Sequence, residues 1–241
     1  MSIKELFIDA SKFAASDWTK FILLGIIFVE IDLLDHATSD ILIPGSLDYV
    51  LLVAFIILVF IEAGYLFRII ESSVDGSDKL PPFTNLLQLF THGLKDSLVV
   101  GIYMFIPAML FVISAGLALI YLGNDISIKF PLELLLISVA IGIIFFIILQ
   151  AAILNMAHNE GKFKSAFDYK GIIKKIQNVG LKKFLVVCFL TALIFVILKP
   201  FIMDELRGYM DPLGSTIMEI IIAPYLSILT SRFLGTMDRY N

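Results

Sequence analysis

The sequence predicts an all-α integral membrane protein: six transmembrane helices arranged as three hairpins, each preceded by an amphipathic helix at the cytoplasmic membrane surface. The chain of 241 residues is 59% hydrophobic and 17% charged, with a mean hydropathy of +0.95. Soluble domains are nearer half apolar and a quarter charged. Long apolar runs also alternate with amphipathic segments along the whole chain. A core alone cannot absorb this excess of apolar side chains, so much of the surface must face lipid.

Six apolar stretches are long enough, or nearly long enough, to cross the hydrocarbon layer, which takes about 20 helical residues. They cover residues 21–35, 49–70, 97–122, 131–157, 184–203 and 213–235. The fourth is the most continuous run. The first is the weakest, because Glu30 and Asp32 interrupt it early.

Three amphipathic segments, at residues 2–20, 84–95 and 169–183, precede the odd-numbered spans. In each, apolar residues recur at intervals of three and four, and charged or polar residues fall between them. This is the pattern of a helix with one wet face. We expect each of these helices to lie in the membrane interface and then turn into a span.

The junctions into these spans resemble one another, which predicts an internal repeat. Gly93-Leu94-Lys95 and Gly180-Leu181-Lys182 are each followed, two residues later, by Leu-Val-Val. We therefore predict three approximate repeats, 1–75, 76–160 and 161–241, within a single membrane domain. Repeats of equal orientation imply a pseudo-threefold axis along the membrane normal.

Basic residues predict that both termini face the cytoplasm of a cell-membrane protein. If the amphipathic segments and termini share one side, that side holds 15 of the 18 lysines and arginines and the other only Lys129, Lys199 and Arg207. Cytoplasmic loops carry such an excess. The basic side suits anionic lipid headgroups, and its candidate contacts are Arg68, Lys174, Lys175, Lys182 and Lys183. The alternative is that the lysine-rich segment is simply a solvated helix face.

Four polar residues inside the predicted spans form a candidate intramembrane polar site: Glu62, Gln150, Asn155 and Glu219. An ionised carboxylate in hydrocarbon is expensive, so an intramembrane acid is a candidate for function. The alternative is that Glu62 and Glu219 are protonated or hydrogen-bonded groups that fix helix packing. Gln150 and Asn155 could likewise hydrogen-bond to neighbouring helices.

Several function classes find no support in the sequence. The net charge of −4 argues against nucleic-acid binding, and the single cysteine, Cys188, can form neither an internal disulfide nor a zinc site. His36, His92 and His158 lack the spacing of metal ligands. No phosphate-binding loop or hydrolase motif is present, so we expect no cofactor and no enzyme activity. An intramembrane enzyme assembled from distant helices is not excluded.

Residues Gly64-Tyr65-Leu66-Phe67-Arg68, then Gly76 and Leu80-Pro81-Pro82-Phe83, resemble the hallmark of a known group. It is the uncharacterised, mostly archaeal family of multi-pass membrane proteins catalogued as domain of unknown function 4013. The similarity continues through Gly93-Leu94-Lys95 and residues 161–168 to Arg232-Phe233-Leu234-Gly235. The resemblance implies a multi-pass topology and a prokaryotic source. It implies no catalytic residue, because the family has no established activity.

The function that the sequence favours is transport or translocation of a small solute, ion or lipid. The predicted repeat, the intramembrane acids and the helix-kinking Pro107, Pro200 and Pro224 motivate it. The alternative is a non-catalytic membrane scaffold or assembly subunit that binds lipid or a partner protein. Membrane lipids are the expected partners in either case, and a protein partner is unknown.

Overall fold

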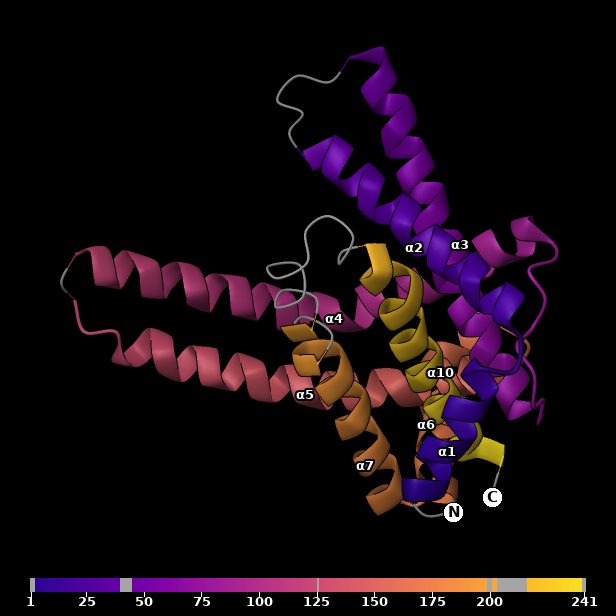
Figure 1. Cartoon of the computed structure of the whole chain (residues 1–241). Coiled ribbons are helices and arrows are strands. Elements are labelled where there is room, and N and C mark those ends of the chain that lie inside the picture. The colour runs from indigo at the N-terminus through magenta and orange to yellow at the C-terminus, as the bar shows by residue number, and fades with distance from the viewer. Residues whose placement is uncertain (1–2, 40–44, 125, 199–200, 203–215, 240–241) are drawn as a thin grey trace.

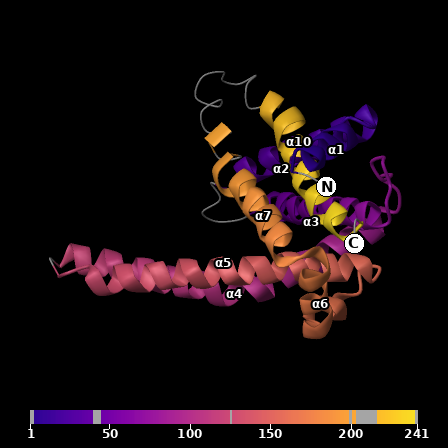
Figure 2. The same ribbon diagram turned by 90° about the horizontal axis from the view of Figure 1, so that it is seen from below.

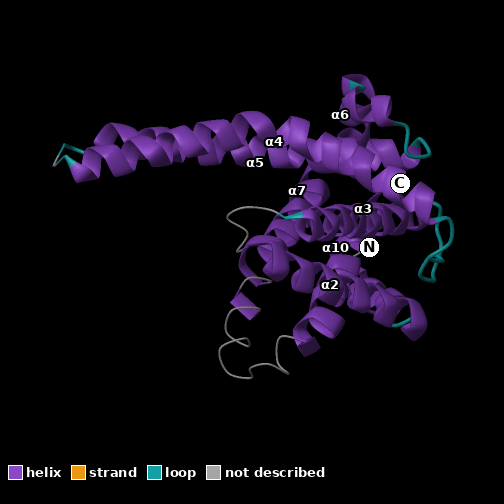
Figure 3. Cartoon of the chain, turned by 90° about the horizontal axis from the view of Figure 1, so that it is seen from above, coloured by secondary structure: helices purple, strands orange, loops and turns teal. Residues whose placement is uncertain are grey.

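The computed structural model describes residues 3–39, 45–124, 126–198, 201–202 and 216–239 (Figure 1). Within these residues the regular structure is entirely helical (Figure 3). The elements in chain order are α1 (Ile3–Ala14), α2 (Trp18–Ser39), α3 (Ser46–Val74), α4 (Leu86–Gly123), α5 (Lys129–His158), the 3-10 turn η1 (Phe163–Phe167), α6 (Tyr169–Val179), α7 (Leu181–Ala192), the π-helical turns η2 (Leu193–Leu198) and η3 (Met218–Ile222), and α10 (Ala223–Arg239).

Among the residues that the structure describes, four helical segments are long and apolar enough to cross a membrane: Leu47–Val74, Leu86–Gly123, Lys129–His158 and Glu219–Asp238. A fifth arises if Tyr169–Val179 and Leu181–Phe195, which meet at a 98° bend, form one broken span. The predicted first span forms α2, which does not qualify because Glu30, Asp32 and Asp35 crowd its second half. Six spans therefore stay a prediction, and parts of the last two, with Pro200, lie outside the described residues.

The helices converge at one end, which we call the hub: α1, α6, α10, the C-terminal turns of α3 and α5, and the N-terminal turns of α4 (Figures 1 and 2). Fully buried side chains concentrate here, among them Phe67, Leu154, Met156 and Phe233. From the hub, α2 and α3 extend together in one direction, and α4 and α5 extend side by side in another (Figure 1). The core of the protein thus lies at the convergence and not along the length of the spans.

Two glycines bring the backbones of α3 and α4 into direct contact at the hub. A Cβ added at Gly64 would overlap the Leu89 carbonyl, and one added at Gly93 would overlap the Phe60 carbonyl. Small residues at helix crossings allow this kind of close approach in membrane proteins. Phe60 and Phe90 flank the crossing edge to face, with their ring centroids 5.4 Å apart.

The linker between α3 and α4 is fixed to the hub by the residues that make up the first part of the family resemblance. The Tyr65 hydroxyl donates to the Pro81 carbonyl at 3.1 Å, and the Tyr65 ring stacks on Phe83. The Arg68 guanidinium donates to the Pro82 carbonyl at 2.9 Å and to the Thr84 carbonyl at 2.7 Å. Helix and linker motifs are therefore two halves of one packed unit.

The predicted amphipathic helices take different forms. α1 is separate from α2, and α6 is separate from α7, because Gly180 adopts φ +83° at the break. Residues 86–95, by contrast, continue without interruption into the span as the first turns of α4. Gly93 stays helical there, since its role is the contact with α3. The similar Gly-Leu-Lys sequences thus have different local structures, and the threefold repeat stays a prediction.

Candidate functional site: a polar pocket between α5, α6 and α10

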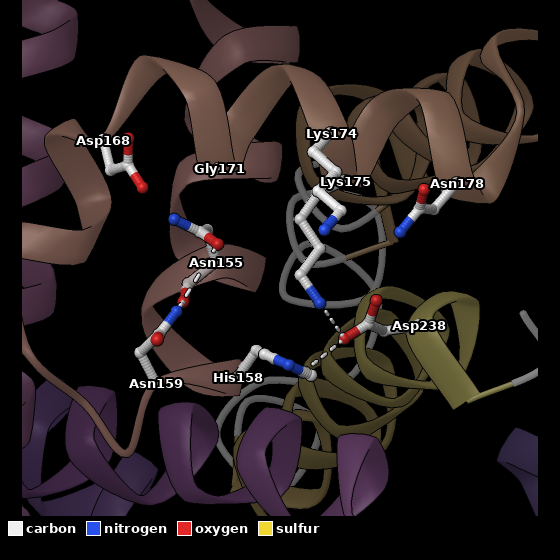
Figure 4. Close-up of a pocket in the computed structure, with 9 residues that line it drawn as sticks. All are labelled: Asn155, His158, Asn159, Asp168, Gly171, Lys174, Lys175, Asn178 and Asp238. Atoms are coloured by element: carbon white, nitrogen blue, oxygen red, sulfur yellow. Dashed lines mark hydrogen bonds and ion pairs between the residues drawn. The ribbon is translucent and has the colours of Figure 1, made fainter.

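A pocket of about 400 Å³ lies at the hub, where the end of α5, the helix α6 and the end of α10 meet (Figure 4). Its lining is almost entirely polar: Asn155, His158, Asn159, Asp168, Gly171, Lys174, Lys175, Asn178 and Asp238. Three of these residues, Asn155, Lys174 and Lys175, are among the sequence-predicted candidates. The fold brings them together although they come from different predicted categories, an intramembrane polar site and lipid-headgroup contacts.

Helix α6 forms one wall of the pocket because its sequence is strongly amphipathic. Its start is capped by the Asp168 carboxylate, which accepts a hydrogen bond from the Lys170 backbone amide at 3.2 Å. Ile172 and Val179 are buried against the hub, whereas Lys174 is exposed. The buried stripe orients the helix, and the polar stripe therefore faces the pocket.

α5 and α6 approach each other closely where Gly171 lies against Asn155, and a larger residue at position 171 would not fit there. A Cβ at Gly171 would come within 2.7 Å of the Asn155 amide nitrogen. That amide donates to the Ser165 carbonyl at 2.8 Å, and the Asn159 amide donates to the Asn155 carbonyl at 2.7 Å. Asn155 is 4% exposed. Its amide thus ties α5 to η1 and holds the floor of the pocket in place.

Asp238 joins all three helices at the opposite wall. The Lys175 ammonium donates to the Asp238 carboxylate at 2.5 Å, and His158 Nδ1 lies 2.9 Å from the same oxygen. Lys175 and Asp238 are both nearly buried. A buried ion pair of this kind is held by its hydrogen bonds, and removing one partner leaves an uncompensated charge. Asp238 therefore fixes the end of α10 against α5 and α6.

Lys174 is the pocket's available cation. Among the described residues, no carboxylate lies within ion-pair distance of its ammonium. The amides of Asn155, Asn159 and Asn178 line the same space (Figure 4). Ammonium and amide N–H groups donate hydrogen bonds, and phosphate or carboxylate oxygens accept them. The arrangement can thus receive an anionic oxygen group, and it contains no activated nucleophile.

The other sequence-predicted residues lie elsewhere. Glu62 is half-buried on α3, and Glu219 is buried in the π-helical turn η3. Gln150 is buried on α5, more than one turn from Asn155 along the helix. Three elements therefore carry the four members of the predicted intramembrane polar site, and only Asn155 lines the polar pocket.

The five basic residues predicted to contact lipid headgroups also lie in different places, and only some of them line the pocket. The Arg68 guanidinium is engaged by the linker carbonyls and by Gln88, to whose side-chain oxygen it donates at 3.2 Å. Lys182 is exposed and Lys183 half-buried on the first turn of α7, beyond the bend at Gly180. Of the five predicted headgroup contacts, Lys174 and Lys175 alone line the pocket.

Sequence reasoning missed a fully buried arginine at the centre of the hub. Arg232 on α10 is 0% exposed and its guanidinium lies over the Phe13 ring, 4.2 Å from the centroid. It donates to Asp9 at 2.8 Å, to the Ser77 carbonyl at 2.6 Å, to Ser73 at 3.2 Å and to Asp78 at 3.4 Å. The available signal was a lone basic residue in the middle of α10, between small and apolar neighbours.

A second polar cluster also joins the helices at the hub. His92 Nδ1 on α4 lies 3.5 Å from the Glu71 carboxylate on α3, and the Lys95 ammonium donates to the Gly161 carbonyl at 3.3 Å. Gly161 adopts φ +65°, and a Cβ there would lie 3.0 Å from the His92 ring. These contacts fasten the turn after α5 to α3 and α4, so we assign them a structural role.

Comparison with known proteins gives one family. The family described as "Protein of unknown function (DUF4013)" matches residues 49–203, which is 155 of the 241 residues and runs from α3 through α7. No curated protein and no solved structure matches the chain. The matched region contains the pocket residues of α5 and α6, whereas Asp238 and Arg232 lie outside it.

Proposed function

We propose that this chain, which belongs to the family described as proteins of unknown function (DUF4013), is a non-catalytic membrane scaffold. In this proposal it binds anionic lipid headgroups in the polar pocket. The observation that carries this proposal is the convergence of Lys174 and three asparagine amides on one pocket, beside a helix bent by 98° from the next. An amphipathic helix followed by such a bend suits the membrane interface, where headgroup phosphates lie.

The net charge of the whole segment around α6 favours an anionic ligand more strongly than the charge of the pocket lining does. The two lysines of the lining are balanced by Asp168 and Asp238. Residues 168–183, however, contain five lysines and one acid, a net charge of +4. Each basic residue near an anionic membrane surface contributes about 1 kcal/mol of attraction. The wider charge would therefore attract the headgroup, and the directed donors of the pocket would orient its phosphate.

We place the hub on the cytoplasmic side of the cell membrane. Nine of the 18 lysines and arginines of the sequence belong to the segments that form the hub, and cytoplasmic segments carry an excess of basic residues. Anionic lipids give the cytoplasmic leaflet its negative surface potential. The proposed headgroup site and the proposed orientation therefore support each other.

The test is the affinity of the purified full chain for dihexanoyl phosphatidylglycerol, whose chains are short enough that the headgroup dominates binding. We expect Lys174→Gln to weaken binding about fivefold, the equivalent of about 1 kcal/mol for one lysine. Lys170→Gln is the matched control, because Lys170 belongs to the same helix and does not line the pocket. It removes the same general charge, so Lys174→Gln must weaken binding more than Lys170→Gln does. Equal affinity of the wild type for dihexanoyl phosphatidylcholine, or an unchanged affinity in Lys174→Gln, would refute the proposal.

Transport of a small solute, ion or lipid stays a second proposal. Its support is the burial of Glu219 within a π-helical turn, because such turns frequently occur at functional sites. Glu62, half-buried on α3, is the other acid concerned. If transport is the function, Glu219→Gln and Glu62→Gln each alter flux in proteoliposomes while the protein stays folded. An unchanged flux would remove this support.

A further inference from the structure

A second and quite different concavity lies between α4, α5 and α7. It has a volume of about 590 Å³, and its walls are apolar: Met104 comes from α4, Gly142 and Phe146 from α5, and Leu185, Cys188 and Phe189 from α7. It shares no lining residue with the polar pocket. The two sites can therefore be tested separately.

The groove is open because α5 presents a glycine to it. A Cβ at Gly142 would meet only the Pro107 side chain, at an ordinary contact distance of 3.8 Å. α5 therefore contributes little side-chain volume at this point. Protein interiors ordinarily fill such space to a density near that of organic crystals, so an unfilled apolar groove between helices is suited to a ligand.

The surroundings of the groove identify the class of ligand. α4 and α5 are both long and apolar enough to span a membrane, and α7 belongs to the bent pair that meets the same criteria. At the depth of these spans the medium is lipid hydrocarbon. Exposed groove residues such as Phe189, which is 66% exposed, would then contact hydrocarbon chains.

A lysine at one end of the groove indicates that the hydrocarbon ligand also carries a negative charge. Lys182 precedes Leu185 by three residues and Phe189 by seven, so the three side chains share one face of α7. Its ammonium is exposed on the first turn of the helix, roughly 10 Å of helical rise from Phe189. A lipid whose chain lies along this face would place its headgroup beside Lys182.

We infer that the groove between α4, α5 and α7 binds one hydrocarbon chain of an anionic phospholipid, with Lys182 contacting the phosphate. The ligand is a long-chain lipid of the surrounding bilayer. The polar pocket, by contrast, recognises a headgroup alone. The inference gives Lys182 a defined partner and goes beyond the proposed function, on which it does not depend.

The first test fills the groove. The full chain, purified and stripped of lipid, is mixed with palmitoyl-oleoyl phosphatidylglycerol, and the bound lipid is counted by native mass spectrometry. We expect Gly142→Leu to weaken binding about tenfold, because its side chain replaces several methylene contacts of the lipid. Gly116→Leu is the matched control, since Gly116 lies on α4 outside the groove and has nothing within 4 Å of an added Cβ. Equal binding by both variants would overturn the inference.

The second test separates chain from headgroup. Lys182→Gln should reduce the preference for phosphatidylglycerol over palmitoyl-oleoyl phosphatidylcholine and leave binding of the latter unchanged. If the preference is unaltered, the assignment of Lys182 is wrong. Lys170→Gln, in α6, serves as the control for loss of one positive charge.

A measurement on the unmodified protein guards against variants that fail to fold. Cys188 is the single cysteine of the chain and lines the groove. Because Cys188 is only 3% exposed, its thiol should react with N-ethylmaleimide slowly, when the groove opens. We expect bound palmitoyl-oleoyl phosphatidylglycerol to slow this alkylation further, whereas dihexanoyl phosphatidylglycerol should not. Equal alkylation rates with and without the long-chain lipid would contradict the inference, whatever the outcome for the polar pocket.

Discussion

Arg232 shows how one side chain can hold a membrane protein together outside the membrane-facing surface. Its guanidinium joins α1 through Asp9, and the end of α3 and its linker through Ser73 and Ser77. A planar group with five donors can serve several acceptors at fixed angles, which a lysine ammonium cannot. The buried charge is tolerated because every side of the group is engaged, including the face over Phe13.

Arg232→Ala should therefore destabilise the protein strongly. The carboxylates of Asp9 and Asp78 stay partly exposed to water, so the main loss comes from Ser73 and the Ser77 carbonyl, at roughly 1–3 kcal/mol for each buried group left without a partner. Arg232→Lys should fall between the wild type and Arg232→Ala. The measurement is the thermal unfolding midpoint in detergent, with Lys164→Ala, an exposed residue of η1, as control. A midpoint for Arg232→Ala equal to that of the control would show that the cluster contributes nothing to stability.

At the same scale, sequence reasoning identified Asn155, Lys174 and Lys175 individually but could not place them in one pocket. Their convergence depends on α6 folding back beside α5, and the partner Asp238 is 63 residues from Lys175. Hydrophobic periodicity reports which face of a helix is wet, and it carries no information about which distant residue lies opposite. Arg232 was missed for the same reason, since Asp9 is 223 residues away.

At the scale of helices, the crossing of α3 and α4 depends on the absence of two side chains. Gly64 and Gly93 bring backbone against backbone, and each would overlap a carbonyl of the other helix if it carried a Cβ. The crossing also explains why α4 is continuous through the sequence Gly93-Leu94-Lys95, whereas the similar Gly180-Leu181-Lys182 begins a new helix after a break. A shared sequence pattern therefore predicted a junction in both places, and packing decided its form.

Gly93→Ala should lower stability, because the added methyl forces α3 and α4 apart. Gly101→Ala in the same helix is the matched control, since nothing lies within 4 Å of an added Cβ there. In the control, alanine should be neutral or stabilise by roughly 0.5–1 kcal/mol through its higher helix propensity. Thermal unfolding of both variants gives the comparison, and equal midpoints would show that the close approach at Gly93 is not required.

For the whole molecule, composition and apolar run length predicted the all-helical membrane class and the positions of most helices. They could not predict the shape, because lipid-facing apolar residues and buried ones look alike in a sequence. Much of α4 and α5 is exposed, whereas most of Glu219–Asp238 is buried. Hydropathy also does not fix the number of spans where acidic residues interrupt an apolar helix, as they do in α2.

The proposed orientation is testable on the intact protein. A reporter that is active only in the cytoplasm, fused at either terminus, should be active in both fusions, because α1 begins and α10 ends at the hub (Figure 1). The physical reason is that lysine and arginine concentrate on the cytoplasmic side of membrane proteins. Activity of one fusion and not the other would mean that the termini lie on opposite sides and that the count of spans is odd.

The contact between Asp9 and Arg232 also orders events in time. Synthesis proceeds at about 5–20 residues per second, so the 223 residues between them take more than about ten seconds to appear. α1 therefore spends that interval without its Arg232 partner, while α3, α4 and α5 are already synthesised. α10 then completes the hub, and a chain that stops before α10 lacks the guanidinium that pairs with Asp9 and covers the Phe13 ring.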